Sequence, residues 1–175
     1  MSNIKNAIVG QSGGPTAAIN ATLAGVIEGA LSSDKIDTVY GLRYGIEGLL
    51  AENTVVLGDI FADAKNLDLL KQTPAAYLGS CRKKLPSPTS DKAEDIALYE
   101  KLFAVLENLN VGYFFYIGGN DSMDTVAKMS VYAEKLGSDI RFIGVPKTID
   151  NDLMATDHTP GFGSAANISQ PSRRR

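Results

Sequence analysis

Short runs of apolar residues alternate along the chain with longer segments in which apolar residues recur every three or four positions. The run 6–9 is followed by glycines and then by a segment from about 17 to 31 that carries Ile19, Leu23 and Val26. Spacings of three and four place these side chains on one face of a helix. A strand followed by such a helix is the repeating unit of a parallel sheet, so the pattern predicts the α/β fold class.

Further strands and helices continue this alternation. Apolar, β-branched and aromatic runs predict strands at 38–42, 54–57, 112–117 and 140–145. A helix is expected from Asp91, because Glu94 has the spacing of a capping box. Another is expected from Ser122 to Gly137, which suits a C-terminal cap. Residues 72–90 mix Gly, Pro and Ser with three consecutive cations, which indicates a functional loop rather than a linker between domains.

Composition limits the classes of protein to which the chain can belong. Its 175 residues, net charge of −3 and 44% apolar content are typical of one globular domain and unlike a polycationic nucleic-acid binder. No apolar run approaches the roughly 20 residues of a membrane span, and the N-terminal run is too short for a secretory signal. The single Cys81 excludes an internal disulfide framework. We expect a cytoplasmic protein that binds neither nucleic acid nor membranes.

Unusual loops follow three of the predicted strands, at 10–16, 118–122 and 146–152. Ligands of open parallel sheets bind beyond the carboxyl ends of the strands. Paired glycines in the first two loops let a ligand approach the backbone, and a helix N-terminus after each loop can receive an anion. The loops therefore predict a phosphate site, although glycine pairs also serve simply to make tight turns.

The third loop carries the side chains best suited to chemistry. Asp150 and Asp152 can accept a proton or help to hold a hydrated magnesium ion, while Lys147 and Arg82 can neutralise phosphoryl oxygens. The alternative is an Asx-turn, in which the acidic side chains only cap the backbone. Neither the P-loop motif nor the dinucleotide motif Gly-x-Gly-x-x-Gly occurs, which disfavours an ordinary P-loop or NAD site.

Four segments, in their order along the chain, resemble the phosphofructokinase family and in particular its pyrophosphate-dependent branch. They are SGGPTAAIN at 12–20, LGSCR at 78–82, GGNDS at 118–122 and PKTIDND at 146–152, and GFGSAA at 161–166 also resembles the family. The resemblance implies a three-layer α/β/α sandwich with a mainly parallel sheet. It also implies that residues 1–166 form the N-terminal, phosphate-donor domain, that 167–175 are an atypical tail, and that a second, sugar-phosphate domain is missing.

The reaction implied by the resemblance is the glycolytic transfer of a phosphoryl group from pyrophosphate to the C1 hydroxyl of fructose 6-phosphate, with Mg²⁺ as cofactor. Asp150 matches the family's general base, and the other catalytic residues expected are Lys147, Arg82 and Asp121. The substrate-binding residues expected are Thr148, Ile149, Asp150 and Asp152. Full-length relatives are expected to be homo-oligomers, and this chain alone is expected to show weak or no turnover.

The donor phosphates are expected at the first three matched segments. Their expected ligands are Gly13, Gly14, Arg82, Lys83, Gly119, Asn120, Asp121 and Ser122. Asn120 and Asp121 are the candidate metal ligands, but Asn120 stands where many relatives have an aspartate. An amide binds a metal only through its oxygen, so this departure weakens the assignment.

Two positions bear on the identity of the donor. Relatives that use ATP typically have glycines where this chain has Asp121 and Lys147. A carboxylate at 121 would repel the α-phosphate of a nucleotide, whereas Lys147 can hold the second phosphate of pyrophosphate. Pyrophosphate is therefore the expected donor. The alternatives are an ATP-dependent 6-phosphofructokinase and a non-catalytic phosphate-binding or subunit-interaction module.

Overall fold

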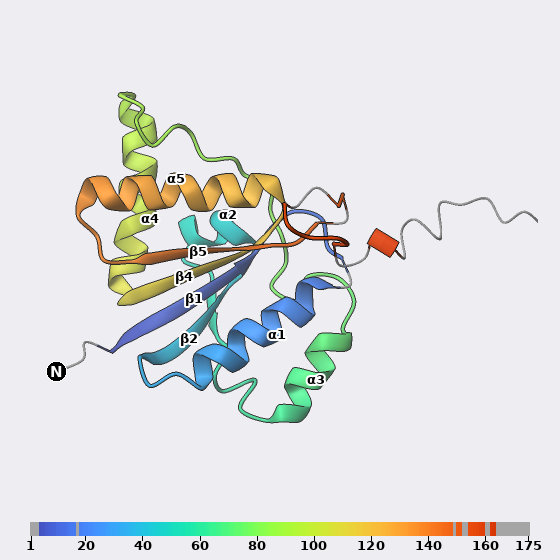
Figure 1. Cartoon of the computed structure of the whole chain (residues 1–175). Coiled ribbons are helices and arrows are strands. Elements are labelled where there is room, and N and C mark those ends of the chain that lie inside the picture. Colours follow the sequence, from blue (N-terminus) through green and yellow to red (C-terminus); the bar gives the residue numbers. More distant parts are fainter. Residues whose placement is uncertain (1–3, 17, 149, 152–153, 160–161, 164–175) are drawn as a thin grey trace, which may run out of the picture.

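The computed structural model describes residues 4–16, 18–148, 150–151, 154–159 and 162–163. Within these described residues, five strands form one mixed sheet in the order β3-β2-β1-β4-β5. The strands are β1 (Lys5–Gln11), β2 (Ile36–Leu42), β3 (Thr54–Val56), β4 (Val111–Gly118) and β5 (Arg141–Pro146). Only the pairing of β3 with β2 is antiparallel. The predicted α/β class and the mainly parallel sheet are confirmed (Figure 1).

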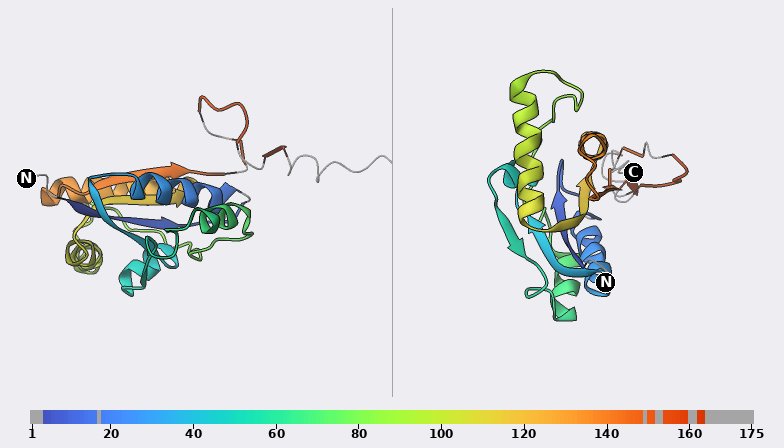
Figure 2. Two further views of the ribbon diagram at one scale, coloured as in Figure 1. Left: turned by 90° about the horizontal axis from the view of Figure 1, so that it is seen from below. Right: turned by 90° about the vertical axis from the view of Figure 1, so that its left-hand side faces the viewer.

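Helices cover both faces of this sheet. They are α1 (Ala18–Leu31), α2 (Gly45–Leu50), α3 (Ala64–Gln72), α4 (Ala93–Asn108) and α5 (Asn120–Leu136). One apolar core packs α1 and α3 against the sheet, and a second core packs α2, α4 and α5 against the opposite face. Figures 1 and 2 show the resulting three layers. Among the described residues, no helix combines the length and hydrophobicity that a bilayer crossing requires.

Alternation of side chains along β1 explains why both faces are apolar. Ile8 packs into the core of α2, α4 and α5, and the next residue, Val9, packs into the core of α1 and α3. Successive side chains of a strand point to opposite faces, so a continuous apolar run is what a sheet buried on both sides requires. The apolar runs at 6–9 and 112–117 were therefore sufficient to predict the two central strands.

Two predicted helix starts need correction. The helix α4 begins at Ala93 and has Lys92 as its N-cap without a side-chain cap, so the start predicted at Asp91 is wrong. Instead, Ser90 Oγ donates to the carboxylate of Asp95 at 2.6 Å. The helix α5 begins at Asn120 rather than at Ser122, and its predicted cap Gly137 is confirmed in the left-handed conformation. The short helices α2 and α3 were not predicted.

The register of the parallel strands brings their carboxyl ends level with one another. Gln11 pairs with Ile117 across β1 and β4, and Gly118 pairs with Pro146 across β4 and β5. The segments that follow these three strands therefore begin side by side along one edge of the sheet. From β1 the chain adds β2 and β3 on one side of the sheet and then β4 and β5 on the other, so the strand order reverses beside β1. Such a reversal is the usual position of a ligand site in open α/β sheets.

Candidate functional site

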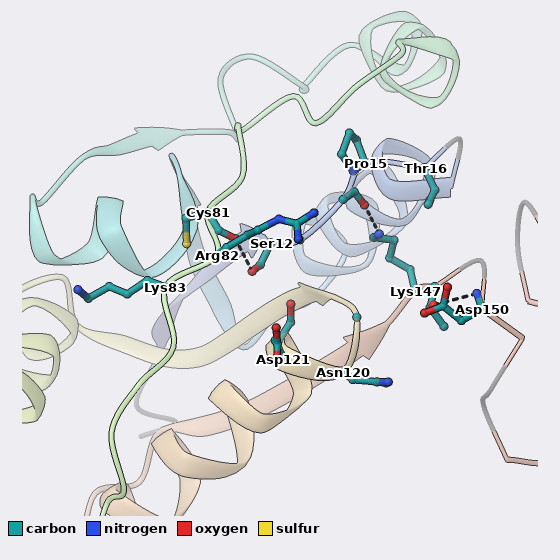
Figure 3. Close-up of a pocket in the computed structure, with 15 residues that line it drawn as sticks. Ser12, Pro15, Thr16, Cys81, Arg82, Lys83, Asn120, Asp121, Lys147 and Asp150 are labelled. Carbon is teal, nitrogen blue, oxygen red and sulfur yellow. Dashed lines mark hydrogen bonds between the residues drawn. The ribbon is translucent and has the colours of Figure 1, made fainter.

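A cavity of about 430 Å³ opens at this edge, lined by segments 12–16, 81–83, 119–122 and 147–148 and by Asp150 (Figure 3). It brings together every predicted site residue that the structure describes. These residues are Gly13, Gly14, Arg82, Lys83, Gly119, Asn120, Asp121, Ser122, Lys147, Thr148 and Asp150. The other two, Ile149 and Asp152, lie outside the described residues.

The loop after β1 is held by hydrogen bonds to two neighbouring segments. Ser12 donates its backbone N–H to Ile117 O at 2.9 Å and its Oγ to Cys81 O at 3.1 Å. Gly13 also donates to Cys81 O, at 3.2 Å, and has a φ of +76°, where residues other than glycine are strained. The first loop and the segment before Arg82 thus form one connected backbone unit.

The turn between β4 and α5 has no room for a side chain at Gly118. A Cβ atom there would lie 2.0 Å from Ser122 Oγ and 2.9 Å from the backbone oxygen of Ser12. This close approach brings the first turn of α5, a helix of 17 residues, next to the first loop. The N-terminal end of the helix dipole is positive, so this end of the cavity favours an anion.

Lys147 supplies a buried cation between the first and last loops. Only 4% of the residue is exposed, its Nζ donates to Gly14 O, and its backbone N–H donates to Gly118 O at 2.9 Å. Burial lowers the pKa of the ammonium, and the charge of Asp150 partly opposes this effect. An anionic ligand in the cavity would stabilise the charged form of Lys147.

This burial predicts a pH dependence of stability. The pKa of Lys147 is lowered from 10.5 in the folded chain, so between the lowered value and 10.5 the unfolded chain binds more protons. The free energy of unfolding, relative to a Lys147→Met variant, should therefore rise with pH in that window, by at most about 1.4 kcal/mol per pH unit. Denaturant unfolding of both proteins at several alkaline pH values measures the difference. A difference that stays constant with pH would contradict the burial of a charged ammonium.

Two cations reach the mouth of the cavity from the segment after Cys81. The guanidinium of Arg82 extends toward Pro15 and Thr16, whereas Lys83 points the opposite way (Figure 3). A Cβ atom at Gly14 would lie 4.0 Å from Arg82 Nη2, so the guanidinium is next to the first loop. Arg82 is thus placed to contact a ligand of that loop, and Lys83 is placed less favourably.

Asp121, in the first turn of α5, forms an ion pair that the sequence did not indicate. Its Oδ1 lies 3.0 Å from the Nζ of Lys84, and both side chains are about 70% exposed (70% for Lys84 and 72% for Asp121). Such an exposed pair contributes little to stability. It does place a positive charge beside the carboxylate, which reduces the repulsion that Asp121 alone would exert on a phosphate.

Asp150 lies at the outer side of the cavity, next to a buried hydroxyl. Its backbone N–H donates to Thr148 Oγ1 at 3.0 Å, and its side chain is exposed. Asn151 and Thr159 close the following loop, with Asn151 N donating to Thr159 Oγ1 at 3.2 Å and Thr159 N donating to Asn151 Oδ1 at 2.9 Å. These bonds join residues eight positions apart and are not an Asx-turn. The exposed side chain of Asp150 lines the cavity.

The donor atoms at the start of α5 suit a metal that arrives with a phosphate. Within the described residues, no group of three or more His, Cys, Asp or Glu side chains is placed to hold a metal ion. Magnesium is usually bound by one or two protein carboxylates together with substrate phosphates and water. Asn120 and Asp121 offer an amide oxygen and a carboxylate at the cavity wall. These atom types suit Mg²⁺ bound to a phosphate ligand, and Asn120 and Asp121 remain the predicted metal ligands.

Comparisons of this chain with a family model, with known sequences and with solved structures all point to the same family. Residues 6–172 match the family model described as phosphofructokinase. The chain is 46% identical over 163 residues to the pyrophosphate–fructose 6-phosphate 1-phosphotransferase of Methylococcus capsulatus, covering 93% of this chain and 37% of the relative. It is 48% identical over 169 residues to the corresponding protein of Xanthomonas campestris pv. campestris, covering 97% and 38%.

A solved structure shows the same fold. The pyrophosphate-dependent phosphofructokinase from Nitrosospira multiformis superposes with a TM-score of 0.82 at 44% identity, over 94% of this chain and 39% of that one. The chain therefore spans less than two-fifths of the length of these relatives.

Proposed function

The chain belongs to the phosphofructokinase family, and from this premise we propose that it forms the phosphate-donor part of a pyrophosphate-dependent 6-phosphofructokinase. The observation that carries the proposal is that one cavity contains Arg82 and Lys147, which flank the glycine loop, together with Asp150 at the outer side of that cavity. Because the chain covers only part of its relatives, we propose that the remaining part of such an enzyme completes the fructose 6-phosphate site. We also propose that the complete enzyme is a homo-oligomer that acts in glycolysis.

Pyrophosphate binds, in this proposal, between the glycine loop and the N-terminus of α5. Backbone groups at Gly13, Gly14 and Gly119 approach its oxygens, and Ser122 lies in the same wall. Arg82 and Lys147 neutralise negative charge on the transferred and leaving groups. Asn120 and Asp121 would hold Mg²⁺, which neutralises phosphate charge when bound. Fixed positive charge around the phosphoryl group is the main source of catalysis in such transfers.

The transfer itself requires a proton acceptor beside the sugar. The C1 oxygen of fructose 6-phosphate forms a bond to the terminal phosphorus while the bond from that phosphorus to the bridging oxygen breaks, which releases orthophosphate. Asp150 takes the proton of the C1 hydroxyl, and Thr148 holds the backbone of Asp150. The role of Lys83 as a donor ligand remains a prediction, and so do the sugar contacts of Ile149 and Asp152.

A specific observation keeps the ATP-dependent alternative open. The preference for pyrophosphate rests on the charge of Asp121, and Lys84 partly offsets that charge. The positive charge of Lys84 weakens the repulsion between Asp121 and a nucleotide phosphate, but it does not make the cavity larger. Pyrophosphate is still the favoured donor, because Lys147 stands where ATP-dependent relatives are expected to have a glycine, and its ammonium is held beside the glycine loop by Gly14 O.

Calorimetry on this chain tests the donor site directly. Pyrophosphate with Mg²⁺ should bind at least about tenfold more tightly than ATP with Mg²⁺. A single contact between the charge of Lys147 and a phosphate changes affinity by about that factor. The Lys147→Met variant should lose most of the pyrophosphate affinity. Equal affinity for both donors would favour an ATP-dependent enzyme. An absence of binding by a chain that unfolds cooperatively would overturn the proposed donor site.

A further inference from the structure

Two side-chain amides beneath the cavity are fully buried and lie outside the machinery described so far. Gln11 is the last residue of β1, and Asn20 lies in the first turns of α1; both have 0% exposure. Gln11 Nε2 donates to Ile19 O at 3.1 Å and to Asn20 Oδ1 at 3.0 Å. Its Oε1 accepts the backbone N–H of Leu78 at 2.9 Å. Gln11 thereby joins β1, α1 and the segment that leads to Arg82.

Asn20 binds the same segment at three further points. Its Nδ2 donates to Thr73 O at 2.8 Å and to Ala75 O at 2.7 Å, and its Oδ1 accepts the N–H of Tyr77 at 2.9 Å. Both N–H groups and both lone pairs of the Asn20 amide are therefore used. We call Gln11 and Asn20 together the amide pair.

Segment 73–78 depends on these bonds for much of its hydrogen bonding. It belongs to neither a helix nor a strand, so its backbone groups have no ladder of their own. Ala75 has a φ of +65°, a conformation that costs free energy in a residue with a Cβ atom and persists only where surrounding contacts impose it. The carbonyl of this same residue is held by Asn20. The amide pair supplies four hydrogen bonds to this segment, and Tyr44 adds a fifth by donating its backbone N–H to Leu78 O at 2.9 Å.

The segment passes directly into the donor site. Gly79 has a φ of +73°, Ser80 Oγ donates to Gly13 O, and Cys81 O accepts the N–H of Gly13. Arg82 is the next residue. A short series of contacts therefore links the amide pair to the backbone position from which the Arg82 side chain extends toward the glycine loop. Phosphoryl transfer is sensitive to such distances, since a 1 Å misplacement can lower a rate by about 100-fold.

We propose that Gln11 and Asn20 are positioning residues that fix Arg82 against the Gly13–Gly14 loop for phosphate transfer. The proposal rests on the proposed function. A satisfied buried polar network specifies one arrangement of the segments that it joins, whereas apolar residues in the same places would leave several backbone groups without partners. The amide pair acts through Arg82 and does not itself contact the donor.

The test uses a hybrid enzyme in which this chain replaces the matching part of its Xanthomonas campestris relative. Gln11→Met removes the bonds of one amide at similar length, and Asn20→Ser removes those of the other. Each should lower kcat/KM for pyrophosphate by about 10- to 100-fold at 25 °C in enzyme that circular dichroism shows to be folded. Met129→Ala is the control, because Met129 is equally buried but packs on the opposite face of the sheet. It should lower the melting temperature with little change in kcat/KM.

Coupling to Arg82 separates positioning from general destabilisation. In an Arg82→Ala background, Gln11→Met and Asn20→Ser should lower kcat/KM by less than about threefold further, because the group that they position is gone. Full additivity of the losses would overturn the proposal. Failure of the proposed function would look different, since Arg82→Ala alone would then leave pyrophosphate use unchanged.

A measurement on the unaltered chain covers the case in which neither variant folds. The amide pair should protect the N–H groups of Tyr77 and Leu78 from hydrogen exchange as strongly as the N–H of Val9 in β1 is protected. Rapid exchange at Tyr77 and Leu78 would show that the bonds do not hold the segment, and would overturn the proposal as well.

Discussion

Asp150→Asn in the hybrid enzyme should lower kcat by about 10²- to 10⁴-fold while leaving the fold intact. Asparagine has the same shape but cannot take the proton of the C1 hydroxyl, and loss of a general base has effects of this size. The exposed side chain of Asp150 is not part of either apolar core, so the melting temperature should change little. Initial rates with saturating pyrophosphate and fructose 6-phosphate measure the loss.

Asp157→Asn is a matched control for this experiment. Asp157 is an exposed acid of the same loop, and it does not line the cavity. The control variant should keep kcat within about threefold of the unaltered hybrid enzyme, as is usual for a surface substitution. Near-normal turnover by Asp150→Asn would remove Asp150 from the role of base and direct attention to Asp152.

The double variant Asp121→Gly/Lys147→Gly should shift the donor preference toward ATP by about 100-fold or more. Glycine at 121 removes the carboxylate that would repel the α-phosphate of a nucleotide. Glycine at 147 removes the cation that would hold pyrophosphate, and it frees the volume that the lysine side chain fills next to Gly14. Each charge change near a phosphate contributes about tenfold or more. The ratio of kcat/KM for pyrophosphate to kcat/KM for ATP, measured in one coupled assay, reports the shift.

Single variants and a neighbouring acid show which charge matters. Asp121→Gly alone should mainly raise ATP use, and Lys147→Gly alone should mainly lower pyrophosphate use. Asp124→Ala is the control, because Asp124 lies in the same helix, pairs with Lys128 at 2.7 Å and is not one of the residues that line the cavity. An unchanged ratio in the double variant would mean that the shape of the remaining enzyme, and not these charges, selects the donor.

Strands of the sheet could be predicted because their signal is local. The run at 112–117 is apolar and aromatic without interruption, and the structure extends it by one residue at each end. The antiparallel strand β3 and the helix α3 are harder cases. In α3 only Leu67 and Leu70 are buried, so its apolar face amounts to two side chains. Its start is marked by the N-cap Asp63, whose side chain accepts the N–H of Lys65 at 2.9 Å.

Convergence of the loops could also be predicted, since it follows from parallel strands ending at one edge. The ion pair of Lys84 with Asp121 could not be, because it depends on where a loop far away in the sequence happens to pass. The role of Asn20 is an intermediate case. It belongs to the first matched segment, but its helical position gives no hint that its amide binds residues 73–77 rather than a ligand.

The central place of β1 has a consequence for how the domain is made. β1 pairs with β2 soon after both have been synthesised, but its other neighbour, β4, is reached only after a long intervening stretch of chain. Closing so long a loop is slow and must precede docking of β5. On the ribosome, the edge of β1 that later pairs with β4 therefore stays exposed until residue 118 has emerged. In that interval this unpaired edge is the surface that a chaperone would protect.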